Sequence, residues 1–254
     1  MNVIDFHCHL DVEEFNENQQ EIIEECFNSG FSKIVTVADP YEEGSYERTV
    51  RALQCNENVL CMAAAHPHNA DRYTPEIEKG ILKFIEEHRA AGYGEAGLDF
   101  HYNLSTPENQ ARVFQRQIAI ADELKLPLII HSRKAETEVL NALEEARFTQ
   151  PVVFHCYTGS KEDAEEILKR GYYISISGIV TFKNADFLRE IVKIIPLDRI
   201  FTETDSPYLS PVPFRGKTNT PLRVTLVAEK VAEIKGIPVE HLNRCINENF
   251  HRII

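Results

Sequence analysis

The chain has 254 residues, 43% hydrophobic and 26% charged, so it is long and apolar enough to bury a large core. Its 27 basic and 40 acidic residues give a formal net charge of −13, which argues against a protein that coats duplex DNA through a basic stripe. The sequence contains no apolar run of about eighteen residues and no basic start followed by an apolar stretch. We therefore expect neither a membrane span nor a signal peptide.

The six cysteines show no C-x-x-C spacing. In a chain of this length without a secretion signal, they are expected to be reduced core residues, and the expected location is cytoplasmic. The acidity of the chain does not exclude a phosphate-bearing substrate, because bound metal ions can be the largest charges in a site.

Short apolar segments alternate with longer segments of helical pattern along the whole chain. The segments expected to be strands are 3–9, 33–37, 59–65, 91–95, 126–131, 152–155, 172–175 and 199–203. The segments expected to be helices are 17–28, 42–56, 75–88, 107–124, 135–146, 161–169, 185–194, 222–235 and 239–253. Eight strands, each followed by a helix, predict an α/β fold: a (β/α)8 TIM barrel that forms a single domain over residues 1–254. An open doubly wound sheet is the alternative, which is disfavoured because no G-x-G-x-x-G follows an early strand.

The first predicted strand carries two histidines. Because side chains alternate along a strand, Asp5, His7 and His9 share one face, and Phe6 and Cys8 lie on the other. Two imidazoles two residues apart can hold one divalent ion. The alternative is an amphipathic edge strand whose histidines face water. We favour the metal site, because Phe6 and Cys8 do not resemble a core face.

Ionisable residues recur where later strands end, after apolar runs. These residues are His66, His68, Glu95, His131, His155, Glu203 and Asp205. In a barrel these positions meet at the C-terminal rim, where such enzymes have their active sites. Any one of these residues alone would be interpreted as a loop residue or as a core histidine whose hydrogen bonds are all made. Five strands that share the feature indicate metal coordination, since burying unpaired ionisable groups is costly.

The ionisable set divides between two divalent ions. The predicted ligands are His7, His9 and Asp205 for the first ion, His131 and His155 for the second, and Glu95 as a bridge between them. Two such ions would acidify a water into hydroxide, and Asp205 is expected to accept its proton, so that Asp205 and Glu95 are the catalytic residues. Nitrogen and oxygen ligands without thiolate suit Mg, Mn, Fe or Zn and do not choose among them.

Several motifs together resemble those of a known family. They are 5–10 (D-F-H-C-H-L), 65–68 (A-H-P-H), 94–99 (G-E-A-G-L-D), 128–133 (L-I-I-H-S-R), 155–159 (H-C-Y-T-G), 203–209 (E-T-D-S-P-Y-L) and 215–221 (R-G-K-T-N-T-P). Over its whole length the chain resembles the TatD family of metal-dependent deoxyribonucleases, within the amidohydrolase-like barrels. The resemblance implies hydrolysis of DNA phosphodiesters, with 3′ ends as the expected point of attack. It also implies metal roles for the same six ligands.

A nuclease also needs donors for the non-bridging phosphate oxygens. The candidates are His66, His68, Arg133, Arg215 and Lys217. For Arg215 and Lys217, ordinary loop charge is an equal alternative. Tyr157 or Phe100 is a candidate for stacking a base. The expected partner is DNA with single-stranded or frayed ends.

Two other functions remain open. The same metals would serve an esterase or amidase that acts on a small molecule or on an aminoacylated RNA end. A non-catalytic scaffold is disfavoured, because a binding module has no need of a proton acceptor such as Asp205. The sequence leaves the oligomeric state open, and a monomer is allowed.

Overall fold

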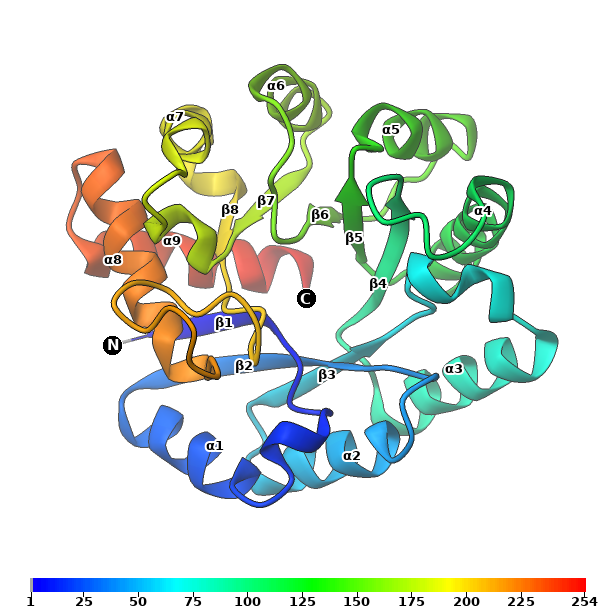
Figure 1. The fold of residues 1–254 in the computed structure, drawn as a ribbon, viewed down its shortest axis with the longest axis horizontal. Helices are drawn as coiled ribbons and strands as arrows, with labels where there is room; N and C mark the ends of the chain where they lie inside the picture. Colours follow the sequence, from blue (N-terminus) through cyan, green and yellow to red (C-terminus); the bar gives the residue numbers. More distant parts are fainter. Residues whose placement is uncertain (1) are drawn as a thin grey trace.

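A computed structural model describes residues 2–254 and has the predicted α/β barrel architecture. Eight parallel strands follow one another in chain order around a barrel, and the helices cover its outside (Figure 1). The strands are β1 (Val3–Cys8), β2 (Phe31–Ala38), β3 (Val59–Ala63), β4 (Gly92–Asp99), β5 (Leu128–Arg133), β6 (Val152–Phe154), β7 (Tyr173–Ile176) and β8 (Ile200–Thr202). The helices are α1 (Gln19–Asn28), α2 (Ser45–Cys55), α3 (Pro75–His88), α4 (Pro107–Leu124), α5 (Glu136–Glu145), α6 (Lys161–Lys169), α7 (Asp186–Ile194), α8 (Val224–Lys235) and α9 (Val239–Ile253). None of the helices within residues 2–254 is long and apolar enough to cross a membrane.

Four helices, α3, α4, α6 and α9, have the bounds that the sequence predicts. Local signals explain three of these starts. The hydroxyls of Thr74, Thr106 and Ser160 accept hydrogen bonds from backbone N–H groups in the first turns of α3, α4 and α6. Pro75 and Pro107 occupy the first helical position, where the missing N–H costs nothing.

The first and last strands meet at the C-terminal rim. The Asp205 N–H donates to the His7 carbonyl oxygen at 3.0 Å, and the His9 N–H donates to the Ser206 carbonyl oxygen at 2.7 Å. These bonds join the two ends of the sheet at residues predicted to hold a metal. Because His7 is fully buried, the edge strand with water-facing histidines is excluded.

The second face of β1 is a core face, contrary to the sequence interpretation. All six residues of β1 are buried. Phe6 stacks on Phe201 with ring centroids 4.1 Å apart and meets Phe250 of α9 edge-on at 6.4 Å. Burying a phenylalanine side chain stabilises a fold by roughly 1.5–3 kcal/mol, so Phe6 helps to anchor the strand that carries His7.

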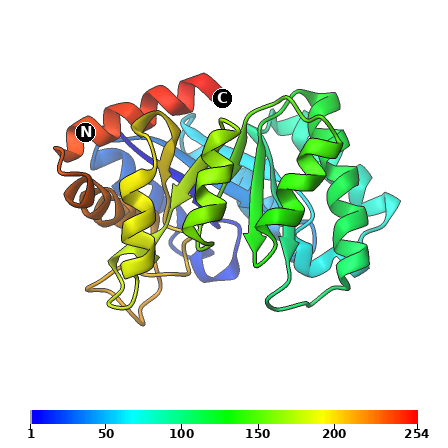
Figure 2. The ribbon, with the colours of Figure 1, turned by 90° about the horizontal axis from the view of Figure 1, so that it is seen from above.

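Strand β4 continues to Asp99, past its predicted end at Glu95. Gly97 makes this possible, because a Cβ there would lie 1.9 Å from the His131 carbonyl oxygen, and its φ of +148° suits glycine. The close approach of β4 to β5 places Glu95 and Asp99 on either side of the His131 ring. Figure 2 shows the barrel from the side. The loop after β8 (gold to orange) lies at the lower left of this view, at the C-terminal end of the barrel.

Candidate metal centre

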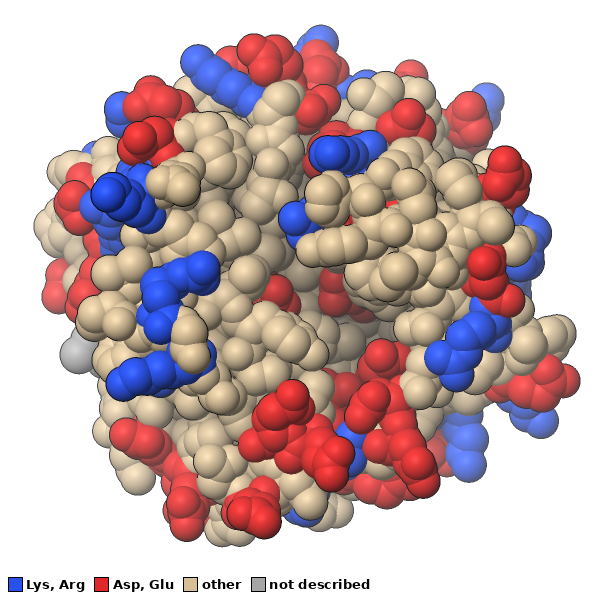
Figure 3. All heavy atoms as spheres, in the orientation of Figure 1, with Lys and Arg blue, Asp and Glu red and all other residues tan. Residues whose placement is uncertain are grey.

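A cavity of about 1160 Å³ opens at the C-terminal rim of the barrel. Its lining includes six of the predicted site residues: His9, His66, His68, Glu95, His131 and His155. Asp205 and Arg133 line it as well. Figure 3 shows this face of the molecule, with a hollow near its middle and carboxylates (red) at the floor. Eight of the predicted site residues thus line one concave site, as is usual for ligand and catalytic sites.

The first cluster lies where β1 meets β8. The Nε2 atom of His7 is 3.4 Å from Glu95 Oε2 and 3.8 Å from Asp205 Oδ1. The Nε2 atom of His9 is 3.3 Å from the same Asp205 oxygen and 3.8 Å from Glu95 Oε2. Two imidazole nitrogens and two carboxylate oxygens therefore surround one point.

The second cluster uses the other oxygen of Glu95. Glu95 Oε1 lies 2.6 Å from His131 Nδ1 and 2.7 Å from His155 Nε2. One carboxylate therefore faces a pair of histidines with each of its two oxygens. Such an arrangement suits a carboxylate that bridges two ions.

The unpaired nitrogens of His7 support a cation at the first cluster. Neither ring nitrogen of His7 has a hydrogen-bond partner within residues 2–254, although the side chain is fully buried. Buried polar atoms without partners are rare and call for a physical reason. A divalent ion bound by the Nε2 lone pair would supply that reason for Nε2, so these residues fit a metal.

Charges in the site are strongly coupled. Burial opposes the charged form of His9, but the hydrogen bond and charge of Asp205 raise its pKa to about 9. Burial likewise opposes ionised Glu95, yet the charges of His155 and His66 and the hydrogen bond from His131 lower its pKa well below the usual range. The carboxylates are therefore ionised and attract positive charge, from protons or from a metal ion.

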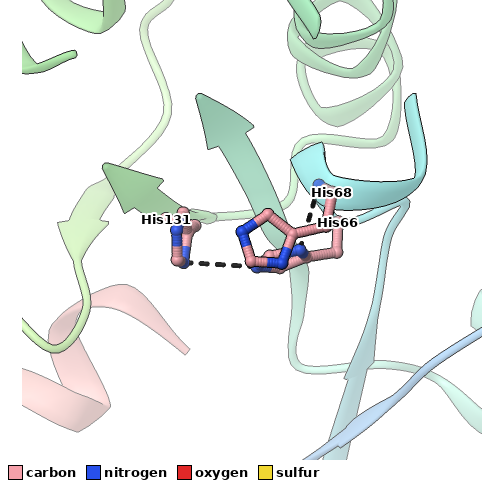
Figure 4. Close-up of side chains that lie close together, drawn as sticks. All are labelled: His66, His68 and His131. Atoms are coloured by element: carbon pink, nitrogen blue, oxygen red, sulfur yellow. Dashed lines mark hydrogen bonds between the residues drawn. The ribbon is translucent and has the colours of Figure 1, made fainter. Parts of the chain in front are cut away.

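His66 and His68 lie beside the second cluster, on the segment that follows β3 (Figure 4). His66 Nε2 is 3.3 Å from His131 Nδ1 and 3.2 Å from Glu95 Oε1, and His66 Nδ1 accepts the His68 N–H at 3.2 Å. Burial lowers the pKa of His66 to about 4, which leaves its ring neutral at pH 7. Both imidazoles thus line the cavity next to the second cluster.

Asp99 is a buried site residue to which the sequence reasoning gave no role. Its Oδ2 lies 2.8 Å from His68 Nε2 and 3.1 Å from His131 Nε2. Its Oδ1 accepts the backbone N–H groups of His101 and Tyr102 at 2.9 and 2.8 Å. A carboxylate on the far nitrogen of a metal-binding histidine fixes the ring and its tautomer. The available signal was an acidic residue four positions after Glu95 on the same strand.

Glu203 acts in the same way on His155. It is fully buried, accepts the Cys156 N–H at 2.6 Å and lies 3.3 Å from His155 Nδ1. Glu203 does not line the cavity, so its placement suits orienting His155 better than contacting a substrate.

The predicted phosphate donors are not all in the cavity. Arg133 lines it and lies over the Tyr102 ring at 4.9 Å. Arg215 and Lys217 are exposed on the loop after β8, and neither lines the cavity. The stacking role expected for Tyr157 is wrong, because its side chain is buried and its hydroxyl donates to the Ser160 carbonyl oxygen. Phe100 packs against the core and does not line the cavity.

Comparisons with known proteins identify relatives of this chain. A family model described as TatD related DNase matches residues 4–254. A Bacillus subtilis (strain 168) protein named uncharacterized metal-dependent hydrolase YabD is 37% identical over 252 residues, which cover 99% of this chain and 98% of that protein. The Escherichia coli (strain K12) protein named uncharacterized metal-dependent hydrolase YcfH is 36% identical over 257 residues, covering 100% and 96%. The crystal structure of YJJV, a TatD homologue from Escherichia coli K12, shares the fold with a TM-score of 0.90 at 24% identity, covering 99% of this chain and 97% of that one. The chain belongs to the TatD related DNase family.

Proposed function

We propose that this metal-dependent hydrolase cleaves phosphodiester bonds of DNA with two divalent ions, at unpaired strand ends and with 3′ ends as the point of attack. One observation carries the two-ion part of the proposal: the two carboxylate oxygens of Glu95 face different sets of histidines. The family model supports DNA as the substrate.

The chain's own residues divide the work. His7, His9 and Asp205 would hold the first ion, and His131 and His155 the second, with Glu95 common to both. When bound, such ions would acidify a water molecule and offset the charge of the phosphate. Asp205 is the proton acceptor. Burial opposes its charged form, but the hydrogen bond and charge of His9 lower its pKa, which keeps the carboxylate ionised near neutral pH.

Phosphate contacts come from three further side chains of the same cavity. His66 and His68 offer imidazole nitrogens next to the second cluster, and Arg133 offers a guanidinium in the same cavity. Guanidinium binds phosphate oxygens in a planar fork, which favours a phosphodiester over a carboxyl ester. The net charge of −13 makes such local donors necessary, because the protein as a whole repels a polyanion.

The substrate class is tested by comparing turnover of three substrates. They are a single-stranded oligonucleotide labelled at either end, a nitrophenyl phosphodiester and a panel of carboxyl esters, each with Mg, Mn and Zn. We expect cleavage of the oligonucleotide from its 3′ end and of the phosphodiester, and both should be lost in Asp205→Asn. Efficient hydrolysis of carboxyl esters without cleavage of either phosphodiester would instead establish the esterase alternative.

A further inference from the structure

One part of the cavity lining is apolar and contains none of the predicted metal ligands. It consists of Ile179, Phe182, Phe187 and Leu209, from the segment after β7, from α7 and from the loop after β8. Phe187 is 48% exposed, which is unusual for phenylalanine. Ile179, Phe182 and Leu209 are half-buried around it, and an exposed apolar side chain in a cavity marks a binding surface. We call these four residues the aromatic wall.

The aromatic wall is held in place by its own loops. Gly178 packs so closely on the loop after β8 that a Cβ there would lie 2.2 Å from the Leu209 carbonyl oxygen. The Arg189 guanidinium of α7 donates to the Phe182 carbonyl oxygen at 3.0 Å. The Val212 N–H donates to the Thr181 hydroxyl at 2.9 Å. A surface fixed in this way loses little conformational freedom when it binds a ligand.

A positive charge stands directly against this wall. The Arg215 guanidinium lies over the Phe182 ring at 3.7 Å from its centroid. No ion pair to Arg215 exists within the described residues 2–254, so its charge is available to an anion. An aromatic ring beside an unpaired arginine matches a ligand with a flat apolar part and a phosphate.

The other side of the rim has the opposite charge. A small pocket next to Tyr208 is lined by Glu13, Glu14 and Glu42, and Figure 3 shows acidic side chains gathered along the lower part of this face. Basic side chains lie on the left of the same view, over the region of the loop after β8 in Figure 1. A polyanionic strand that enters the metal centre is therefore repelled on the β1 side and attracted towards the aromatic wall.

We propose that the aromatic wall is a subsite for one unpaired nucleobase of the strand, close to the cleaved phosphodiester, with Phe187 as its stacking surface and Arg215 on a neighbouring phosphate. The subsite rests on the proposed function. It gives a physical reason for a preference for unpaired ends, because a base can reach Phe187 only after leaving its stack in a duplex.

Steady-state cleavage of single-stranded oligonucleotides tests the subsite. In each oligonucleotide, one nucleoside is replaced in turn by a propanediol spacer, which keeps the phosphates and removes one base. For the wild-type enzyme, we expect one spacer position to raise KM by roughly 5- to 100-fold, the range expected for one base stacked on an aromatic side chain. Phe187→Ala should raise KM for the intact strand by a similar factor with kcat little changed, and the spacer at that position should then have no further effect.

Two matched variants complete the design. Phe187→Tyr keeps the aromatic ring and should retain the wild-type KM. Leu124→Ala removes an apolar side chain that is 42% exposed but outside the cavity, and should change neither KM nor kcat. Equal spacer effects in wild type and Phe187→Ala, or an unchanged KM in Phe187→Ala, would overturn the subsite and leave the nuclease function standing. Failure of the wild-type enzyme to cleave any oligonucleotide, while it hydrolyses carboxyl esters, would overturn the proposed function and the subsite with it.

Discussion

Replacing Asp99 by asparagine isolates the role of a residue that does not itself belong to either metal cluster. In the wild type, Oδ2 of Asp99 can accept protons from the Nε2 atoms of both His68 and His131, while Oδ1 caps two backbone N–H groups. Asparagine has only one oxygen. Either its NH2 group faces the two histidines, or it faces the two backbone N–H groups. In both orientations a donor meets a donor.

The expected loss follows from what His131 must do. To offer its Nδ1 lone pair to an ion shared with Glu95, His131 must carry its proton on Nε2, and Asp99 stabilises that tautomer by accepting the Nε2 proton. Loss of an outer carboxylate partner typically costs 10–100-fold in metal affinity or activity, or about 1.4–2.7 kcal/mol. We expect Asp99→Asn to weaken the second ion by this factor and to leave the first ion largely unaffected.

Competition titration against a fluorescent chelator measures both affinities. Asp71→Asn is the matched control, because Asp71 binds Thr106 and Asn109 at the start of α4 and does not touch a predicted ligand. Equal weakening of both ions in Asp99→Asn would indicate a general loss of structure. Unchanged affinity of the second ion would refute the positioning role.

Three further predictions follow from the same geometry. Asp205→Asn should lower kcat by roughly 10²–10⁴-fold, and excess metal should not restore it. Excess metal should partly restore the activity of His7→Ala. Equal recovery of activity by both variants in a metal titration would show that Asp205 is merely a ligand. Arg215→Ala should raise KM on DNA more than it lowers kcat, and an unchanged KM would return Arg215 to ordinary loop charge. Because Asp205 raises the pKa of His9 to about 9 and a bound ion needs the neutral ring, metal binding near pH 7 should release a proton. Affinity for the first ion should then rise about tenfold per pH unit towards pH 9. Calorimetric titrations in buffers of different ionisation enthalpy measure the protons released, and the absence of proton release would contradict this prediction.

Much of the fold was predictable because local signals agree with the global pattern. Alternating apolar and helical segments indicate parallel βαβ units, and capping residues such as Thr106 and Ser160 fix where helices begin. The rim residues followed from the fold itself, since parallel strands that end in His, Glu or Asp must bring those ends together. This is how His131 and His155, from different strands, were expected to share Glu95.

Contacts between loops could not be predicted in the same way. Whether Arg215 lies in the cavity or beside Phe182 depends on how the loop after β8 packs against Gly178, which no periodicity encodes. Tyr157 looked available to a base but is buried under its own loop. Asp99 escaped assignment because β4 extends four residues beyond its expected end, an extension that depends on the close contact at Gly97.

The number and positions of the bound ions test the central claim most directly. Crystals loaded with Mn and measured by anomalous diffraction should show two ions, with Glu95 common to both. The first should be bound by His7, His9 and Asp205, and the second by His131 and His155. Elemental analysis of the same protein should give two ions per chain. A single ion under every loading condition would contradict the bridging role of Glu95, and the absence of any bound ion would contradict the metal centre itself.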